Sequence, residues 1–321
     1  MNVNDFEKKQ MVFVFTMDGE KIVFRNDNIC VIDSEGVIKL QITCYRVLSL
    51  NIVGHVTITS AIIQKSNKFG FPIFLMTTSF RTYDCIGHRT EGNTVLRRTQ
   101  YEQNGCEIAK QIVCNKIRNQ IDTLNLQRTW DWKLRESIDY LESLYQEAHS
   151  FMGDYRGLMG IEGNASKCYF ERNFDNCHWS GRKPRVKQDP INSTLDIGYT
   201  ILFNFIDTIT MLFGFDTYYG VYHREFYQRK SLICDLVEPF RPLIDWQVRK
   251  AINLGQIKEE HFNNVKGKYL LDIRFNKDYI RFLSEPLLIH KMSIFRYIRD
   301  YYRAVMREYG ADQYPFFTIR E

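Results

Sequence analysis

The sequence predicts an α+β protein in which an N-terminal β-rich domain is followed by a larger, mainly α-helical domain. The chain has 321 residues, enough for roughly two domains. Short β-branched and aromatic runs fill the first quarter of the chain, which is typical of strands. After about residue 90 they give way to long stretches with apolar residues at the 3.6-residue helical period. We therefore place the β-rich domain at residues 1–90 and the helical domain at residues 91–321.

Residues 11–88 carry the strand signals. Four runs of strand-forming residues lie close together, separated by candidate tight turns: MVFVF, EKIVF, NICVID and VIKLQIT. The stretch ITSAIIQKSNK at 58–68 predicts a helix, and FPIFLMTT after it predicts a further strand. The N-terminal domain is therefore a small sheet-based unit.

Helical periodicity dominates the remainder of the chain. Residues 107–121 and 133–148 place isoleucines and leucines on one helical face, and further helices are predicted at about 191–213 and 289–307. The most apolar stretch, 201–215, is interrupted by Asn204 and Asp207. It falls short of the roughly 18 continuous apolar residues of a membrane span, so we expect a buried helix and no membrane.

Composition narrows the class of protein. Hydrophobic residues make up 44% of the chain and charged residues 25%, which predicts a globular protein. The net charge of +5 permits an anionic partner. The eight cysteines form no C-x-x-C pair, which indicates free thiols in a reducing compartment. The first residues do not form a signal peptide, so we expect a cytoplasmic protein.

Two acids and a histidine lie close together in the sequence. A helix beginning near Ser231, a reasonable N-cap, would place Asp235 and Glu238 on one face, because positions three apart are neighbours there. His223 would lie at the entrance of this helix. A solvated helix face is the commoner explanation of such an acidic pair, and a lone histidine is more often structural than catalytic.

A third acid, Glu162, lies in the segment LMGIEGNASKCYF among apolar and small residues. A buried acid must be paired, protonated or bound to a cation; a capping glutamate near a helix start is the alternative. Carboxylates with one imidazole suit Mg²⁺ or Mn²⁺. Such an ion can polarise a phosphodiester and activate a hydroxyl nucleophile.

A basic segment, WSGRKPRVKQDPIN, provides a candidate surface for an anionic substrate. Pro184 and Pro190 keep it out of a helix, so we expect an exposed loop that can follow a phosphate backbone. A solubilising loop is the alternative. The candidate nucleic-acid-binding residues are Arg182, Lys183, Arg185 and Lys187 in this loop, and Arg224, Arg229 and Lys230 near His223.

Four segments together carry a family resemblance. In order and spacing, LMGIEGNASKCYF, RKPRVKQDPINSTLDIGYTIL, GFDTYYGVYH and SLICDLVEPFRP resemble the Cas1 family, the integrase subunit of CRISPR spacer acquisition. The likeness is strongest over residues 155–245. It implies that Glu162, His223 and Glu238 bind the metal and that Asp235 supports the site, all four being catalytic. The third ligand is Asp in some members and Glu here, which gives a longer reach with the same charge.

The resemblance also implies partners and a reaction. Family members form homodimers through the β domains, and a small Cas2 partner protein bridges two dimers. The implied substrates are double-stranded DNA with splayed or single-stranded 3′ ends and CRISPR repeat DNA. The 3′-hydroxyl of a fragment attacks a phosphodiester of the array, and with water as the nucleophile the same site acts as a metal-dependent endonuclease. The N-terminal half is similar to acquisition proteins of class 2, type V systems.

Two other functions fit the same residues. A non-catalytic DNA-binding subunit would use the acids only as caps and as partners of arginines. A metal-dependent RNA-processing nuclease would differ from a DNA integrase only in its substrate. Neither a G-x-G-x-x-G nor a G-x-x-x-x-G-K-[ST] motif occurs, so a dinucleotide-dependent or P-loop enzyme is not indicated.

Overall fold

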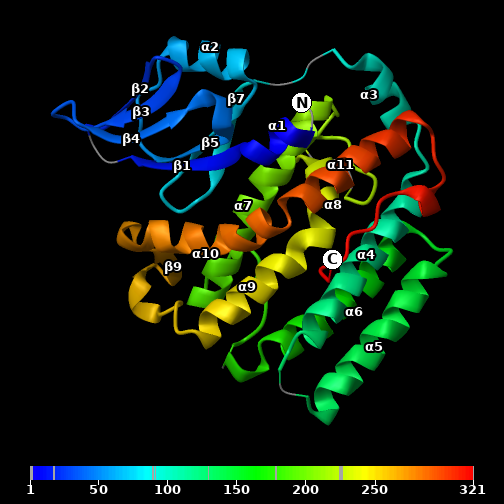
Figure 1. The fold of residues 1–321 in the computed structure, drawn as a ribbon. Helices are drawn as coiled ribbons and strands as arrows, with labels where there is room; N and C mark the ends of the chain where they lie inside the picture. Colours follow the sequence, from blue (N-terminus) through cyan, green and yellow to red (C-terminus); the bar gives the residue numbers. More distant parts are fainter. Residues whose placement is uncertain are drawn as a thin grey trace. The chain divides into compact units, whose positions relative to one another are not determined.

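The computed structural model describes residues 3–16, 19–88, 90, 92–128, 130–177, 179–223 and 227–320. By its internal contacts the chain divides into two compact units (Figure 1). The first contains Met1–Asn93 and Asp207–Gly214, and the second contains Thr94–Ile206 and Phe215–Glu321. The predicted order of a strand-rich region followed by a helix-rich region is confirmed.

The first unit is built on two sheets. In the four-stranded sheet the order is β1-β5-β6-β7, with β1, β5 and β6 parallel and β7 antiparallel to β6; the second sheet is the antiparallel meander β2-β3-β4. The elements are α1 (Val3–Lys8), β1 (Gln10–Thr16), β2 (Lys21–Arg25), β3 (Asn28–Ile32), β4 (Ile38–Thr43), β5 (Val47–Gly54), α2 (Ser60–Phe69), β6 (Pro72–Met76) and β7 (Thr82–Gly87).

Strand β5 is the centre of this unit. All eight of its residues are buried, as expected for a strand flanked by parallel neighbours. Its buried polar residues Ser49 and Asn51 interrupt the apolar pattern, and Asn51 Nδ2 donates to Ser49 Oγ at 3.2 Å. This explains why the sequence pattern does not separate β5 from its surroundings. Ile62 of α2 completes the core, packed with side chains of these strands.

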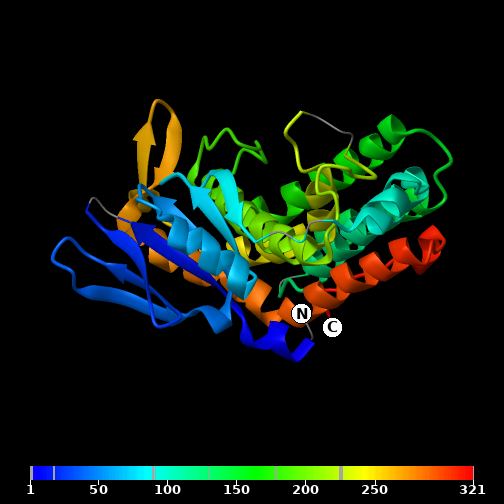
Figure 2. The same cartoon turned by 90° about the horizontal axis from the view of Figure 1, so that it is seen from above.

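The second unit consists mainly of helices. They are α3 (Thr94–Tyr101), α4 (Gly105–Asn125), α5 (Trp132–His149), α6 (Tyr155–Asn173), α7 (Pro190–Phe213), α8 (Ser231–Val237), α9 (Arg241–Asn253), α10 (Asn276–Ile289) and α11 (Lys291–Met306). The last turns of α7 belong to the first unit. A short 3₁₀ helix, η3 (Glu238–Phe240), joins α8 to α9. A hairpin of β8 (Phe262–Val265) and β9 (Lys268–Leu271) stands out from the helices (Figure 2).

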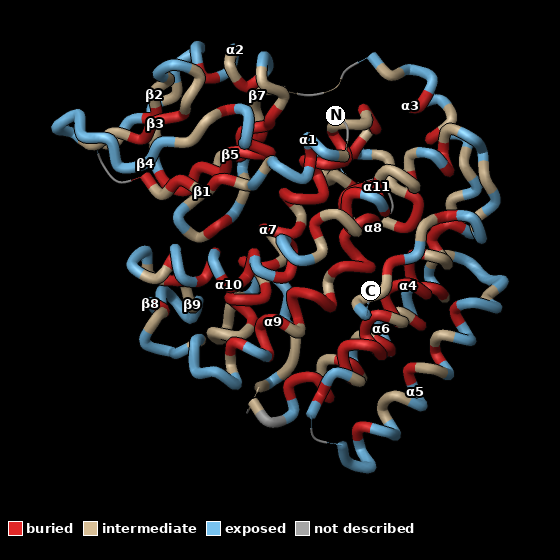
Figure 3. Tube along the Cα trace, viewed as in Figure 1, coloured by how far each residue is buried: buried red, intermediate tan, exposed pale blue. Residues whose placement is uncertain are grey.

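Helices α4, α5 and α6 pack side by side (Figure 1). Their shared core includes Ile117 and Ile121 of α4, Leu141 of α5 and Leu158 and Ile161 of α6. Buried residues follow nearly the whole length of α4, whereas α5 is exposed along its outer face (Figure 3). Helix α4 is therefore the central support of the second unit.

Helix α4 also carries a buried polar stripe. Asn115 Nδ2 donates to the Phe317 carbonyl at 2.6 Å, and the Phe317 N–H donates back to Asn115 Oδ1 at 2.9 Å. Asn119 Nδ2 donates to the carbonyls of Pro239 and Phe317 at 3.0 and 2.9 Å. These bonds fix the C-terminal segment and η3 against α4, because buried amides and carbonyls must find partners.

Helix α7 is long and apolar enough to cross a membrane by length and composition alone. Of its most apolar window, 72% is buried inside the structure, as in the core helix of a soluble protein. The expectation of a buried helix in this part of the chain is therefore confirmed.

The close packing of α7 depends on Gly198. A Cβ atom at this position would lie 2.5 Å from Ile244 Cγ2 and 3.2 Å from Leu283 Cδ2. We expect Gly198→Ala to lower the free energy of unfolding by about 1–3 kcal/mol through overpacking. Gly160→Ala in α6 is the matched control, because no atom lies within 4 Å of its added Cβ.

Gly160→Ala should raise stability by about 0.5–1 kcal/mol through helix propensity. Urea unfolding of both variants measures the two effects. Equal changes in the two variants would contradict the role assigned to Gly198.

Candidate active site

Glu162 lies in the middle of α6. The helix is capped by Asp154, whose side chain accepts a hydrogen bond from the Gly157 N–H at 3.0 Å. The alternative that Glu162 is a capping glutamate is therefore wrong. One turn further along, Ser166 Oγ donates to Glu162 Oε1 at 2.9 Å, so the carboxylate is oriented from its own helix.

Asp235 and Glu238 lie on successive short helices. Ser231 is the first residue of α8, and Lys230 holds the N-cap position with no capping hydrogen bond from its side chain, so the N-cap expected at Ser231 is wrong. Asp235 is in α8 and is completely buried, and Glu238 begins η3 and is 5% exposed. Although they are three residues apart, their carboxylates contact different groups.

Asp235 organises the loop that carries His223. Its Oδ2 accepts the N–H groups of Val221 and Tyr222 at 2.6 and 3.0 Å. Its Oδ1 accepts the backbone N–H of His223 at 2.8 Å and lies 2.8 Å from His223 Nδ1. A carboxylate can only accept, so Nδ1 carries the proton and Nε2 keeps its lone pair in the neutral ring. Such a carboxylate partner is typical of histidines that bind metals.

Gly220 makes this loop possible. A Cβ at residue 220 would lie 2.6 Å from Asp235 Oδ2 and 2.9 Å from the Ser231 carbonyl oxygen. Only glycine lets the backbone approach the buried carboxylate this closely. The glycine of the GVYH segment is therefore required by the position of the Asp235 carboxylate.

Lys116 of α4 joins Glu162 to Glu238. Its Nζ donates to Glu162 Oε1 and lies 2.7 Å from Glu238 Oε2. Arg241 Nε donates to the other oxygen of Glu238 at 2.9 Å. Carboxylates from α6 and η3 thus meet around a single ammonium group, which is itself only 8% exposed.

The electrostatics keep these groups ionised. Burial acts to raise the pKa of Glu238, but the charges of Arg241, Lys116 and His223 outweigh it and lower the pKa to about 2. Burial acts to lower the pKa of Lys116, but Glu162 and Glu238 outweigh it and raise this pKa. The influence of His223 on Glu238 places the imidazole close to this carboxylate.

Tyr222 adds a buried hydroxyl beside the acids. Burial, followed by the charges of Glu162, Glu238 and Asp235, raises its pKa, so the hydroxyl stays protonated. Among the described residues it has no hydrogen-bond partner. Because buried hydroxyls normally have a hydrogen-bond partner, the Tyr222 hydroxyl can bind a further group that enters the site beside the three carboxylates.

The predicted metal ligands are brought together in part. Within the described ranges, no three His, Cys, Asp or Glu side chains already form a cluster able to hold a metal ion. Glu162 and Glu238 share the ammonium of Lys116, and the imidazole of His223 is held by the carboxylate of Asp235. Two carboxylates, an imidazole nitrogen and the Tyr222 hydroxyl fit the preferences of Mg²⁺ or Mn²⁺.

A second polar network is connected to Glu238 through Arg241. The guanidinium groups of Arg241 and Arg182 lie over the ring of Tyr199, at 4.7 and 5.3 Å from its centroid. The Tyr199 hydroxyl donates to Asp245, which is 1% exposed. Burial raises the pKa of Asp245 to about 7, against the lowering effects of Tyr199, Arg241 and Arg182.

The basic segment is a loop up to Asp189, as predicted, but Pro190 does not keep the chain out of a helix, because it is the first residue of α7, a position that proline tolerates. The residues of the loop differ in exposure. Arg182 donates to Asp196 at 2.6 Å and to Asn192 at 3.0 Å. It therefore forms a structural ion pair and is also a candidate contact for a nucleic acid. Lys183 and Arg185 are exposed, and Lys187 is half-buried. Near His223, Arg229 and Lys230 are half-buried, and Arg224 lies outside the described residues.

The β8–β9 hairpin extends this basic surface. The Tyr269 N–H donates to the Lys187 carbonyl at 2.8 Å, which ties the hairpin to the loop. Lys266 and Lys268 at its tip are exposed. Burial, and to a smaller extent the charge of Lys268, lowers the pKa of Lys187, so these two lysines are neighbours.

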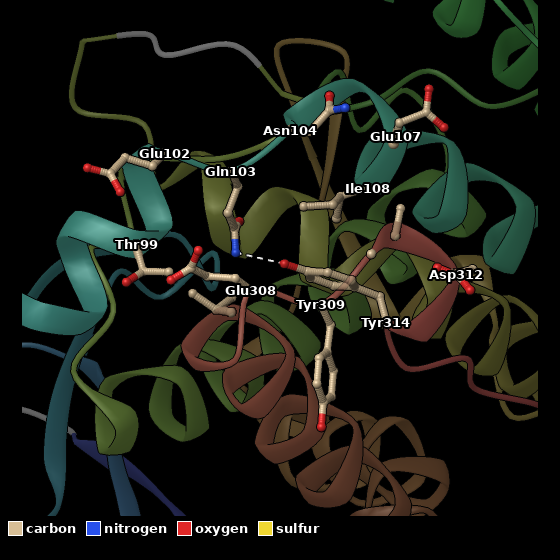
Figure 4. Close-up of a pocket in the computed structure, with 13 residues that line it drawn as sticks. Thr99, Glu102, Gln103, Asn104, Glu107, Ile108, Glu308, Tyr309, Asp312 and Tyr314 are labelled. Atoms are coloured by element: carbon tan, nitrogen blue, oxygen red, sulfur yellow. Dashed lines mark hydrogen bonds between the residues drawn. The ribbon is translucent and has the colours of Figure 1, made fainter.

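A cavity of about 450 Å³ lies elsewhere in the second unit (Figure 4). It opens between the start of α4 and the C-terminal segment, and its lining includes Glu102, Glu107, Glu308 and Asp312. No predicted site residue lines it. Its acidic walls are unsuited to a phosphate backbone.

Sequence reasoning missed Lys116 and the hairpin lysines. Lys116 lies in the run IVCNKIRNQID, between apolar residues whose period predicts a buried face. A lysine on such a face must have an acidic partner. Its position on a buried face is therefore the signal from which a salt bridge at Lys116 could be predicted. The hairpin strands FNNV and KYLL are four residues each, too short for a clear alternation.

The fold defines a class of protein. A Cas1 protein of Thermotoga maritima superposes with a TM-score of 0.81 at 19% identity, covering 92% of this chain and 97% of that one. A casposase bound to an integration product superposes with a TM-score of 0.77 at 17% identity, covering 97% and 95%. The architecture is therefore the one that Cas1 proteins and casposases share.

The family follows from the sequence comparison. The family model described as CRISPR associated protein Cas1 matches residues 13–285. The chain belongs to the Cas1 family, and the predicted resemblance to this family is confirmed. The similarity to class 2, type V systems stays a prediction.

The curated relatives include proteins matched over most of their length and a longer fusion. CRISPR-associated endonuclease Cas1 1 of Thermodesulfovibrio yellowstonii is 29% identical over 232 residues, covering 67% of this chain and 73% of the relative. CRISPR-associated endonuclease Cas1 1 of Thermus thermophilus is 24% identical over 282 residues, 87% of each protein. A Cas4/Cas1 fusion of Rhodospirillum rubrum is 27% identical, and the match covers 56% of that longer protein.

Asp245 gives the site a pH signature. Its raised pKa means that the folded protein binds more protons than the unfolded chain between about pH 4 and pH 7. The contribution of Asp245 to the free energy of unfolding should therefore fall as the pH rises through this window, by at most roughly 4 kcal/mol. Asp245→Asn cannot titrate and should flatten this slope, measured by urea unfolding at several pH values. An unchanged slope in the variant would contradict the assignment.

Proposed function

We propose that this protein is a metal-dependent DNA endonuclease and strand transferase that inserts DNA fragments into a CRISPR array. The 3′-oxygen of a fragment forms a new bond to phosphorus, and the bond from that phosphorus to the 3′-oxygen of the array strand breaks. The attacking hydroxyl loses its proton and the departing 3′-oxygen gains one, so no external energy source is needed. Membership of the Cas1 family supports this proposal, as do relatives named as endonucleases.

One observation carries the proposal: Glu162 and Glu238 come from separate elements and converge on a single cationic centre, with His223 held beside them by Asp235. A divalent ion held by Glu162, Glu238 and His223 would polarise the phosphodiester and activate the attacking hydroxyl. Asp235 keeps the Nδ1 proton in place and so presents Nε2 as the free nitrogen. The protonated Tyr222 hydroxyl is a donor for an oxygen in the site.

The basic loop and the hairpin tip are the proposed path of the DNA. Lys183, Arg185, Lys266 and Lys268 offer exposed charge to a phosphate backbone. The loop is linked to the acids, because Arg182 and Arg241 share the ring of Tyr199 and Arg241 binds Glu238. A strand bound along the loop therefore passes close to the proposed metal ligands.

The proposed assembly is a homodimer formed through the β-rich domains, with a Cas2 protein bridging two dimers. Two structures with the same fold support Cas2 and DNA as partners by what their names say they contain. One with a TM-score of 0.81 is a Cas6-RT-Cas1–Cas2 complex, and another with a TM-score of 0.60 is a complex of a Cas1 protein with DNA. The cytoplasm of a prokaryote is the proposed location.

A second candidate function, a non-catalytic DNA-binding subunit, is favoured by one observation. Glu162 and Glu238 are paired with Lys116 and Arg241, as acids with only a structural role would be. This candidate requires salt-sensitive DNA binding with no cleavage at any metal concentration, so activity assays decide between the two.

Substitution of the proposed ligands tests the catalytic role. Glu162→Gln and His223→Ala should each lower Mn²⁺-dependent strand transfer by roughly 100-fold, because a lost ligand or a lost orienting contact weakens metal binding and activity. The assay joins a fragment with splayed 3′ ends to repeat DNA, with a single-stranded RNA in parallel. Glu142→Gln, which removes a carboxylate that pairs with Arg118 at 2.6 Å, is the control. Parental activity in both ligand variants would refute the catalytic assignment.

Neutralising the basic surface tests the DNA path. Lys183→Gln with Arg185→Gln, and Lys266→Gln with Lys268→Gln, should each reduce the slope of log K against log salt by about 2 for duplex DNA. Lys258→Gln is the control, because Lys258 already lies 3.4 Å from Glu260. Fluorescence anisotropy over a salt series measures the slope, and an unchanged slope in both double variants would remove these residues from the interface.

A further inference from the structure

The Lys116 ammonium stands at the centre of the proposed metal site, yet the reaction described above gives it no role. Its side chain is 10% exposed, and its Nζ contacts Glu162 Oε1 and lies 2.7 Å from Glu238 Oε2. Without it, two carboxylates would face each other in a largely buried site. Like charges at such a distance repel strongly, so this ammonium determines how close the acids can stay.

The backbone of Lys116 is fixed in the structure, and its ammonium reaches the acids through the side chain alone. Asn115 and Asn119 on either side anchor α4 to the C-terminal segment and to the Pro239 carbonyl. The ammonium itself sits on a flexible four-carbon stem with several rotatable bonds. The side chains of Glu162 and His223 are 21% and 15% exposed, which leaves the site open to solvent on one side.

We propose that Lys116 is a built-in surrogate for the divalent ion. It holds Glu162 and Glu238 together in the metal-free protein and gives up at least one of these contacts when an ion binds. An octahedral ion needs carboxylate oxygens at about 2.0–2.1 Å, and an ammonium bonded to the same oxygens occupies that space. Lysine and metal therefore compete for the same ligands. This inference rests on the proposed metal-dependent function.

Mn²⁺ binding without DNA tests the competition. The signal of free Mn²⁺ in electron paramagnetic resonance is titrated against the wild-type chain, Lys116→Met and Lys110→Met. Methionine keeps the stem and removes the charge. Lys110 is the matched control, because it lies on the same helix and pairs with Glu107 at 2.7 Å. Lys116→Met should bind Mn²⁺ at least roughly tenfold more tightly than wild type, and Lys110→Met should bind as wild type does.

Stability provides a second readout. Metal-free Lys116→Met should melt at a lower temperature than wild type and gain more from saturating Mn²⁺. Equal or weaker Mn²⁺ binding by Lys116→Met, in a protein whose wild type binds the ion, would overturn the surrogate role and leave the metal site standing. A wild type that binds no Mn²⁺ would overturn the proposed function together with this inference.

A measurement on the wild type covers the case in which Lys116→Met does not fold. The ¹⁵N-lysine spectrum of the chain should contain a Lys116 ammonium signal, assigned by its loss in Lys116→Arg, that shifts or disappears as Mg²⁺ is added. A signal that stays unchanged at saturating Mg²⁺ would show that the ion leaves the lysine contacts intact. That result would overturn the inference.

Discussion

Compensation of buried negative charge is the constraint on which the second unit depends. Asp235, Glu238 and Asp245 are each at most 5% exposed, and a buried carboxylate without partners costs several kcal/mol. Each is compensated differently. Asp235 accepts three backbone N–H groups and His223, Glu238 binds two cations, and Asp245 accepts from Tyr199 and has a pKa raised to about 7.

The partners of these acids come from distant segments, so compensation also assembles the site. Asp235 in α8 shapes the loop that carries His223, and Glu238 draws Lys116 from α4. Helix α4 packs its apolar face into the core with α5 and α6 while its polar stripe holds η3 and the C-terminal segment. One helix therefore sets both the packing of the unit and the position of the acids.

The order of the two regions could be predicted because strand and helix periods are strong local signals. Strand β5 could not be recognised in the sequence, because the buried polar residues Ser49 and Asn51 interrupt its apolar pattern. The strands of the β8–β9 hairpin have four residues each, too few to show an alternation. The site acids stood out by chemistry and by family resemblance. Their partner Lys116 did not, because an isolated lysine in a helix is usually exposed, and its burial depends on acids that only the fold brings near. The N-cap predicted at Ser231 is wrong for a different reason: α8 begins one residue earlier than expected, at Ser231 itself.

The pairing of the acids with lysine and arginine does not by itself make the site inert. Among the described residues, Glu162 and Glu238 pair with two permanent cations, Lys116 and Arg241, and Asp235 pairs with His223. Replacing the single charge of Lys116 by a divalent ion would balance the three negative charges together with Arg241. A structural cluster would be expected to satisfy its polar atoms fully, yet the Tyr222 hydroxyl is buried without a partner among the described residues. On the proposed function, a metal ion would supply a further positive charge, and a phosphate oxygen would supply the acceptor that the Tyr222 hydroxyl lacks among the described residues.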